Sequence, residues 1–225
     1  MIELENVAMS YGGRTLFSGV SLELAQGSFH FLTGPSGAGK TTLIRLCSLE
    51  MPPSEGRVRL LGHDTADLDR DGVADMRQRI GVVHQDSQFI DHLSLAENIG
   101  LPVMVSDTGP ALADAEMEQL LGWVGLKGQA GSMPAHLSGG ERQRGALARA
   151  VVRAPDLVLA DEPTGNVDWE MSLRILDLLV ELNLSGKTIL CATHDLTLIR
   201  KAKTRVNARV LRLRNGSIEL AGAEL

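Results

Sequence analysis

Residues 31–46 read FLTGPSGAGKTTLIRL, and this stretch decides the fold class. An apolar segment leads into a glycine-rich loop, and an amphipathic segment that begins at Lys40 follows it. Residues 34–41 match the pattern G-x-x-x-x-G-K-[ST] between an expected strand and an expected helix, the context in which such a loop binds phosphate. Glycines let successive backbone N–H groups converge on phosphate oxygens, and the helix adds the positive end of its dipole.

The loop therefore predicts a binding site for a nucleoside triphosphate. Lys40 would neutralise the β- and γ-phosphates, and the Thr41 hydroxyl would hold Mg²⁺. The alternative is a connecting loop that is merely rich in glycine, which leaves the Lys-Thr pair unexplained. The residues expected to contact the nucleotide here are Gly34, Pro35, Ser36, Gly37, Ala38, Gly39, Lys40, Thr41 and Thr42.

Composition sets limits on the class of protein. The 225 residues are 44% hydrophobic and 22% charged, which is ordinary for one globular domain with a sizeable core. The net charge of −6 argues against binding nucleic acid through phosphate neutralisation. We expect neither a cleaved secretory signal nor a membrane span. Cys47 and Cys191 lie among apolar neighbours and are expected to be buried free thiols.

Patterning predicts an α/β fold with a mostly parallel sheet. Residues 2–11 and 18–27 alternate apolar and polar side chains, as antiparallel strands with one exposed face do. Short, nearly continuous apolar runs, FHFLTG, IGVVHQD, DLVLADE and KTILCATHD, fit parallel strands covered on both faces. Helical spacing dominates about residues 86–155, so we expect a helical lobe, with Trp123 in its core, inserted into a single domain of residues 1–225. Asn215-Gly216 predicts a C-terminal hairpin.

A pair of acids follows the third apolar run. In LVLADE, Asp161 is placed to reach Mg²⁺, and Glu162 to orient and deprotonate an attacking water. The structural alternative is that the two acids simply begin a solvated loop. His194, after ILCAT, stands at the end of an expected strand, where a histidine can simply cap a loop.

A second glycine pair precedes another expected helix. Ser138-Gly139-Gly140 leads into a segment whose first turn contains Glu141, and we expect this helix N-terminus to be open to an anion. No lysine stands at this loop, so it predicts half of a phosphate site, which needs a phosphate held elsewhere. Taken alone, LSGGE could be a plain N-cap.

Together these motifs resemble the ATP-binding cassette (ABC) family over essentially the whole chain. Residues 34–41 match its Walker A loop, residues 137–141 its signature, residues 161–162 its Walker B acids and residues 166–168 its D-loop. Tyr11 matches the aromatic residue that stacks on adenine, Gln85 the Q-loop glutamine and His194 the switch histidine. The resemblance implies ATP hydrolysis with Mg²⁺ in a head-to-tail homodimer, in which each ATP lies between the Walker A loop of one copy and the signature of the other.

The resemblance also assigns site residues. Glu162, His194 and Gln85 are expected to be catalytic, and Thr41, Gln85 and Asp161 are expected to hold the metal. Beyond the Walker A loop, the expected nucleotide contacts are Tyr11, Ser138, Gly139, Gly140 and Asp168.

DEPTGNVD resembles the branch of this family that serves cell division, lipoprotein release and macrolide export, and other stretches look most like the cell-division members. That branch implies an integral membrane partner, docked near Gln85, and a peripheral location at the cytoplasmic face of the inner membrane. A lipoprotein-release or efflux subunit is the alternative. A soluble P-loop phosphotransferase would leave LSGGE and His194 without a role. A DNA-repair or translation cassette would usually carry a coiled-coil insertion or a second cassette.

Overall fold

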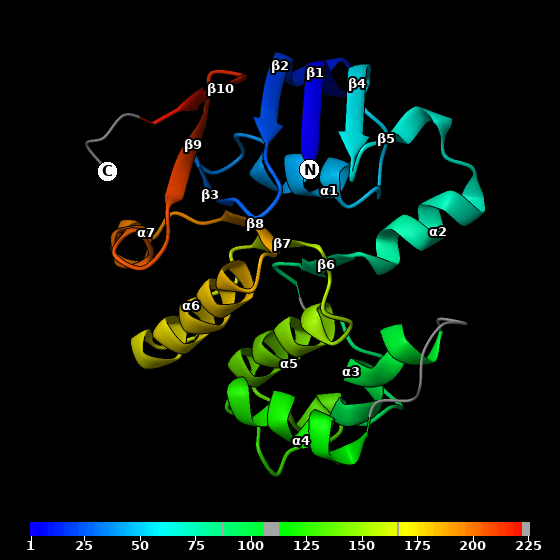
Figure 1. Ribbon diagram of the computed structural model, residues 1–225, viewed down its shortest axis with the longest axis vertical. Coiled ribbons are helices and arrows are strands. Elements are labelled where there is room, and N and C mark those ends of the chain that lie inside the picture. The colour runs from blue at the N-terminus through cyan, green and yellow to red at the C-terminus, as the bar shows by residue number, and fades with distance from the viewer. Residues whose placement is uncertain (87, 106–112, 166, 222–225) are drawn as a thin grey trace.

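The computed structural model describes residues 1–86, 88–105, 113–165 and 167–221 as two sheets and the helices around them (Figure 1). The four-stranded sheet is antiparallel, with strand order β2-β1-β4-β5. Its strands are β1 (Ile2–Tyr11), β2 (Arg14–Leu24), β4 (Glu55–Leu60) and β5 (His63–Asp64). The antiparallel strands predicted from alternation are confirmed.

The six-stranded sheet has the order β10-β9-β3-β8-β7-β6 and is parallel from β9 to β6. Its strands are β3 (Phe29–Thr33), β6 (Ile80–Val83), β7 (Leu157–Asp161), β8 (Thr188–Ala192), β9 (Ala208–Arg214) and β10 (Ser217–Leu220). The four apolar runs form the parallel strands β3, β6, β7 and β8, as predicted, and β9 is a further parallel strand beside β3. Asn215 and Gly216 have positive φ angles of 52° and 75°, so the predicted hairpin joins β9 to β10 through a turn with left-handed backbone at both positions.

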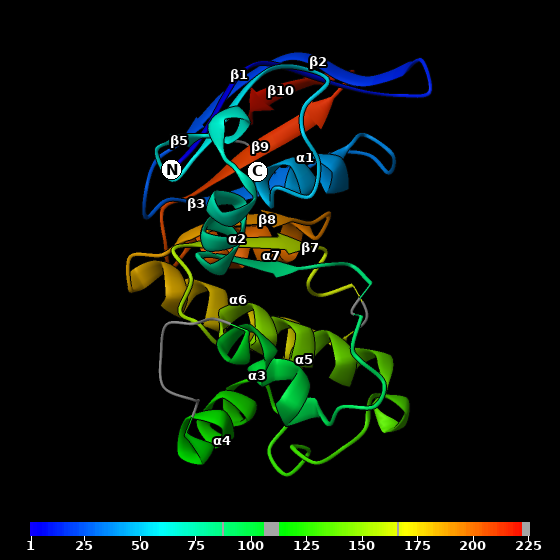
Figure 2. The same cartoon turned by 90° about the vertical axis from the view of Figure 1, so that its right-hand side faces the viewer.

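Both faces of the parallel sheet are covered. Helix α1 (Lys40–Cys47) lies between the two sheets and buries Leu43, Ile44, Leu46 and Cys47 there (Figure 2). Helices α5 (Gly139–Val151), α6 (Trp169–Leu184) and α7 (Leu196–Lys203) pack on the other face. Helix α2 (Arg70–Gln78) leads into β6, and the short 3-10 turns span Thr65–Asp67 and Pro134–His136. Cys47 and Cys191 are buried and free, as expected, and burial raises the pKa of Cys47 to about 12.

Between β6 and β7, the described residues form the α-helices α3 (Leu95–Met104), α4 (Asp114–Trp123) and α5. Their buried side chains belong to the same hydrophobic core as α6, α7 and the face of the parallel sheet that those two helices cover. A Cβ added at Gly81 of β6 would lie 2.1 Å from the Ala150 carbonyl oxygen, so α5 and the sheet touch backbone to backbone. Trp123 is 53% exposed, which corrects the expectation that it packs in the core. It is the last residue of α4, while Leu121 provides the buried contact.

The buried side chain of His30 predicts how the free energy of unfolding depends on pH. Its side chain is buried in β3, its Nδ1 has no hydrogen-bond partner, and burial together with nearby Arg209 lowers its pKa from 6.5 to about 4. Between those pH values the unfolded chain binds a proton that the folded chain does not. The free energy of unfolding should therefore fall as the pH falls from 6.5 to 4, by at most about 1.4 kcal/mol per pH unit from this group.

Urea unfolding at several pH values measures this effect. His30→Leu should flatten the pH dependence in that interval, whereas the same change at the exposed His63 should leave it intact. An unchanged slope in His30→Leu would assign the acid sensitivity to other groups.

Candidate active site

The carboxyl ends of the parallel strands border a cavity of about 670 Å³, as parallel sheets do at their ligand-binding edge. Side chains from the loop before α1 meet there with residues that follow β6, β7 and β8. The lining residues are Leu16, Gly34, Ser36, Gly37, Gly39, Lys40, Thr41, Thr42, Gln85, Asp161, Glu162, Gly165 and His194. Most of the predicted site is thus brought together from segments far apart in sequence.

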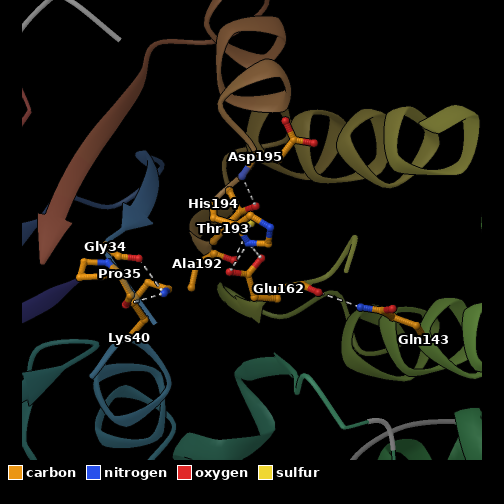
Figure 3. A network of polar contacts seen from close by, with 10 residues as sticks. Gly34, Pro35, Lys40, Gln143, Glu162, Ala192, Thr193, His194 and Asp195 are labelled. Carbon is orange, nitrogen blue, oxygen red and sulfur yellow. Dashed lines mark hydrogen bonds and ion pairs between the residues drawn. The ribbon is translucent and has the colours of Figure 1, made fainter. Parts of the chain in front are cut away.

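The phosphate-binding loop has glycine where no side chain fits. A Cβ at Gly34 would lie 2.3 Å from the Leu213 carbonyl oxygen, and Gly39 has a φ of 104° with Phe17 packed against it. Lys40 Nζ donates to the carbonyl oxygens of Gly34 at 2.9 Å and Pro35 at 3.3 Å (Figure 3). The ammonium group therefore folds over the loop, where a phosphate in the cradle can replace the carbonyl oxygens as its acceptor.

Asp161 ends β7 as a buried carboxyl group. Burial raises its pKa above the ordinary value. The side-chain hydrogen bond from Thr41 opposes this effect, and the neighbouring Glu162 carboxylate adds to it. Asp161, Thr41 and Gln85 present carboxylate, hydroxyl and amide oxygens to the same cavity. Oxygen donors of this kind fit Mg²⁺, and a cation there would favour the ionised form of Asp161.

Glu162 is held through both its backbone and its side chain (Figure 3). Its φ is +47°, and its N–H donates to the Ala192 carbonyl oxygen at 2.9 Å. Its carbonyl oxygen accepts from the Gly165 N–H at 3.1 Å and from Gln143 Nε2 at 2.8 Å. His194 Nδ1 lies 3.0 Å from each carboxylate oxygen. An acceptor side chain with a fixed direction and a histidine beside it suits proton transfer from a water in the cavity.

The signature segment lies outside the described lining of this cavity. Ser138 caps α5 in a capping box: its N–H and Oγ–H donate to Glu141 Oε2 at 2.8 and 2.7 Å, and Glu141 N–H donates back to Ser138 Oγ at 3.3 Å. These bonds from Ser138 lower the pKa of Glu141. A carboxylate therefore takes the Ser138 donors, as the plain N-cap alternative has it, and the anion contact at this helix start stays a prediction. The first N–H groups of the helix, on Gly139 and Gly140, have no partner within the helix.

Four other predicted residues also lie away from the described lining: Pro35, Ala38, Tyr11 and Asp168. Tyr11 ends β1 with an exposed ring, and its hydroxyl donates to Met51 Sδ at 3.1 Å. Asp168 caps α6 by accepting from the Met171 N–H at 2.9 Å. Asn166, in the predicted D-loop, lies outside the described residues.

Three residues at the site were not predicted. Leu16 and Gly165 line the cavity, and Gln143 reaches the Glu162 backbone. The sequence could have indicated Gln143, because this polar residue shares the buried face of α5 with Ala146 and Leu147, three and four positions later.

Comparison with known proteins places this geometry in a family. The family model described as ABC transporter matches residues 17–165. The chain belongs to the ABC transporter family. It is an ATPase of that family with the α/β fold expected from its motifs.

Three relatives of this ABC ATPase are each named cell division ATP-binding protein FtsE. Those of Haemophilus influenzae and Escherichia coli K12 are both 40% identical to it, over 89% and 97% of this chain and 93% and 97% of their own lengths. The Bacillus subtilis relative is 36% identical over 92% of each chain. The resemblance to the cell-division branch is confirmed.

Two solved structures at 33% identity each cover 97% of both chains. One is a dimeric ATP-binding cassette in a post-hydrolysis state bound to ADP and Pi, with a TM-score of 0.88. The other is a dimeric bacterial ABC transporter cassette, with a TM-score of 0.87. Within the described part of this chain, none of the helices has the length and apolar character needed to cross a bilayer.

Proposed function

We propose that this ATPase works as a head-to-tail homodimer that closes around ATP and passes the closure to an integral membrane partner. One observation carries the dimer: the chain's own cavity contains the Walker A and Walker B residues, while none of residues 137–141 is among the described lining. A second copy can supply the missing segment. The dimeric state of two solved relatives supports this arrangement.

In this proposal, different residues of the same chain bind the phosphates, hold the metal ion and activate the attacking water. The loop N–H groups and Lys40 bind the β- and γ-phosphates. Thr41, Gln85 and Asp161 would hold Mg²⁺, which supplies charge stabilisation at the phosphate oxygens when bound. Glu162 takes a proton from the attacking water, with Gln85 at the same edge of the cavity. His194 holds the Glu162 carboxylate and contacts the γ-phosphate, so both side chains act on the bond that breaks.

The second copy would present its Ser138 segment to the γ-phosphate. The free N–H groups at the start of α5 provide the donors. Asp168, the N-cap of α6, is a further expected nucleotide contact. Tyr11 is the expected adenine contact, since its exposed ring is available for stacking. Loss of the γ-phosphate would remove the charge that holds both surfaces together, so hydrolysis opens the dimer.

For the membrane partner we propose an FtsX-like protein, with regulation of peptidoglycan remodelling in cell division as the output. The support is the name shared by the relatives and a groove of about 580 Å³ beside the catalytic edge. The groove lies between α2, β6 and the α3 and α5 helices of the inserted lobe that we assign to about residues 86–155. Its lining includes Arg77, Ile80, His84, Leu101, Pro102, Val105, Arg149 and Arg153.

Apolar and basic side chains together suit an amphipathic helix with acidic residues from the membrane partner. Such docking would make the chain a peripheral protein at the cytoplasmic face of the inner membrane. Subunits of the LolD or MacB type, for lipoprotein release or efflux, would use the same kind of groove with a different permease.

Recruitment to vesicles tests the partner. Val105, 75% exposed in the groove, is changed to Asp, and Leu184, 63% exposed on α6, is changed to Asp as the matched control. Vesicles that contain the FtsX-like protein should bind Val105→Asp at least about tenfold more weakly than wild type, because a charge must be buried against the docked helix. They should bind Leu184→Asp normally. Recruitment only by vesicles that contain a LolD- or MacB-type permease would overturn the cell-division assignment.

A further inference from the structure

Gln143 is a polar residue kept in the packed interior. It lies on α5 with 2% of its side chain exposed, and its Nε2 donates to the Glu162 carbonyl oxygen at 2.8 Å (Figure 3). Its Oε1 is buried without a hydrogen-bond partner. A buried amide with one side unsatisfied costs stability. The hydrogen bond from Gln143 Nε2 to the Glu162 carbonyl oxygen is therefore the favourable contact that stands against this cost.

The bond acts on an unusual backbone. Glu162 has left-handed backbone geometry, which non-glycine residues adopt only where the surroundings determine it. Gln143 and the Gly165 N–H fix its carbonyl oxygen from one side, while its own N–H is fixed by Ala192. These contacts set the direction in which the carboxylate leaves the chain. A small rotation of this peptide would move the carboxylate away from its position beside His194.

Gln143 belongs to the helix that begins at the signature. Ser138 is the N-cap of α5, and Gln143 follows within the first two turns. A helix moves as a rigid unit over this length, so a displacement of its start reaches Gln143. The same helix touches β6 backbone to backbone at the Gly81–Ala150 contact near its C-terminal end, and Gly145 packs closely against Leu95 and Phe89.

We propose that Gln143 is a positioning residue that transmits the state of the signature segment to Glu162 of the same chain. This inference rests on the proposed head-to-tail dimer. There the signature faces the nucleotide of the second copy, whereas Glu162 serves the chain's own nucleotide. Gln143 thus makes the alignment of one catalytic carboxylate depend on occupancy of the other site, which predicts that ATP hydrolysis depends cooperatively on ATP concentration.

Two substitutions separate positioning from packing. Gln143→Met keeps the volume and removes the donor. Gln143→Glu puts a second acceptor opposite the Glu162 carbonyl oxygen until the new carboxyl group binds a proton. Leu147→Met, at a buried apolar position on the same helix, is the control for altered packing. Each is assayed for kcat, KM for ATP and the Hill coefficient. Dimer formation with ATP is measured with Glu162→Gln added.

Gln143→Met should lower kcat roughly 10- to 100-fold with KM unchanged, because misplacement of a catalytic group by less than an ångström has effects of this size. Its Hill coefficient should fall towards one. The kcat of Gln143→Glu, relative to wild type at the same pH, should rise as the pH falls from about 8 to 6, since the protonated carboxyl group can donate again. Leu147→Met should stay within about twofold of wild type.

The inference is overturned if Gln143→Met keeps its kcat, if KM rises in parallel with the loss, or if Leu147→Met loses as much. If Gln143→Met does not fold, the test is the kcat of Gln143→Glu relative to wild type at each pH. A ratio that stays constant between about pH 8 and 6 overturns the proposal. The test is separate from that of the dimer itself. A Glu162→Gln protein that stays monomeric with ATP contradicts the proposed function, whereas a normal dimer combined with an unaffected Gln143→Met contradicts only the role of Gln143.

Discussion

Glu162→Gln should bind ATP, hydrolyse it about 10²- to 10⁴-fold more slowly than wild type and accumulate as an ATP-bound dimer. The amide keeps the shape of the side chain but cannot take a proton from the attacking water. The γ-phosphate then persists and continues to hold the two copies together. Removing the negative charge also reduces repulsion between this side chain and the phosphate. Light scattering at saturating ATP and single-turnover hydrolysis measure the two effects.

The matched control is Glu118→Gln on the exposed side of α4, which removes the same charge far from the cavity. It should leave turnover and the association equilibrium at wild-type values. A Glu162→Gln protein that binds ATP and remains a monomer would count against closure of two copies around the nucleotide. Hydrolysis at the wild-type rate would show that Glu162 is not the base.

Lys40→Ala should lose ATP affinity by about 100-fold or more. The ammonium group donates charge-assisted bonds to the phosphates, and loss of about 3 kcal/mol corresponds to that factor. The fold should survive, because within the described residues the hydrogen bonds from Lys40 Nζ go to the Gly34 and Pro35 carbonyl oxygens of its own loop. Calorimetric titration with ATP and Mg²⁺ gives the affinity, and thermal melting without nucleotide checks the fold.

Lys127→Ala, an exposed change of the same kind, should bind ATP normally. Tight ATP binding by Lys40→Ala would contradict the assignment of residues 34–41 as the phosphate cradle. Weak binding combined with a large drop in melting temperature would instead show that the lysine is structural.

Much of the fold follows from local sequence. The parallel strands β3, β6, β7 and β8 are predictable because each is a short, nearly continuous apolar run. The edge that they form brings Lys40, Asp161, Glu162 and His194 to one cavity. The hairpin at Asn215-Gly216 is predictable because both residues accept left-handed backbone. The parallel pairing of β9 with β3 joins segments almost at opposite ends of the chain, and no local pattern encodes that choice of neighbour.

The misses have physical causes. Trp123 looks like a core residue by type, but Leu121 and Val124 face the core, and Trp123 lies between them on a different side of the helix end. The capping box at Ser138 agrees with the N-cap alternative for LSGGE, since Ser-x-x-Glu before a helix is the capping-box pattern. The bond from Gln143 to Glu162 joins residues on separate elements, so the sequence reveals a polar residue on a buried stripe but not its partner.

The central claim is that one copy holds the triphosphate and a second copy completes its site. The most direct test measures the ATP hydrolysis rate per chain of the wild-type protein across a series of dilutions at saturating ATP. Light scattering on the same samples gives the molecular mass. The rate per chain should fall with dilution in step with the dimer fraction and approach zero for the monomer. A rate per chain that stays constant while the protein is monomeric would contradict the claim.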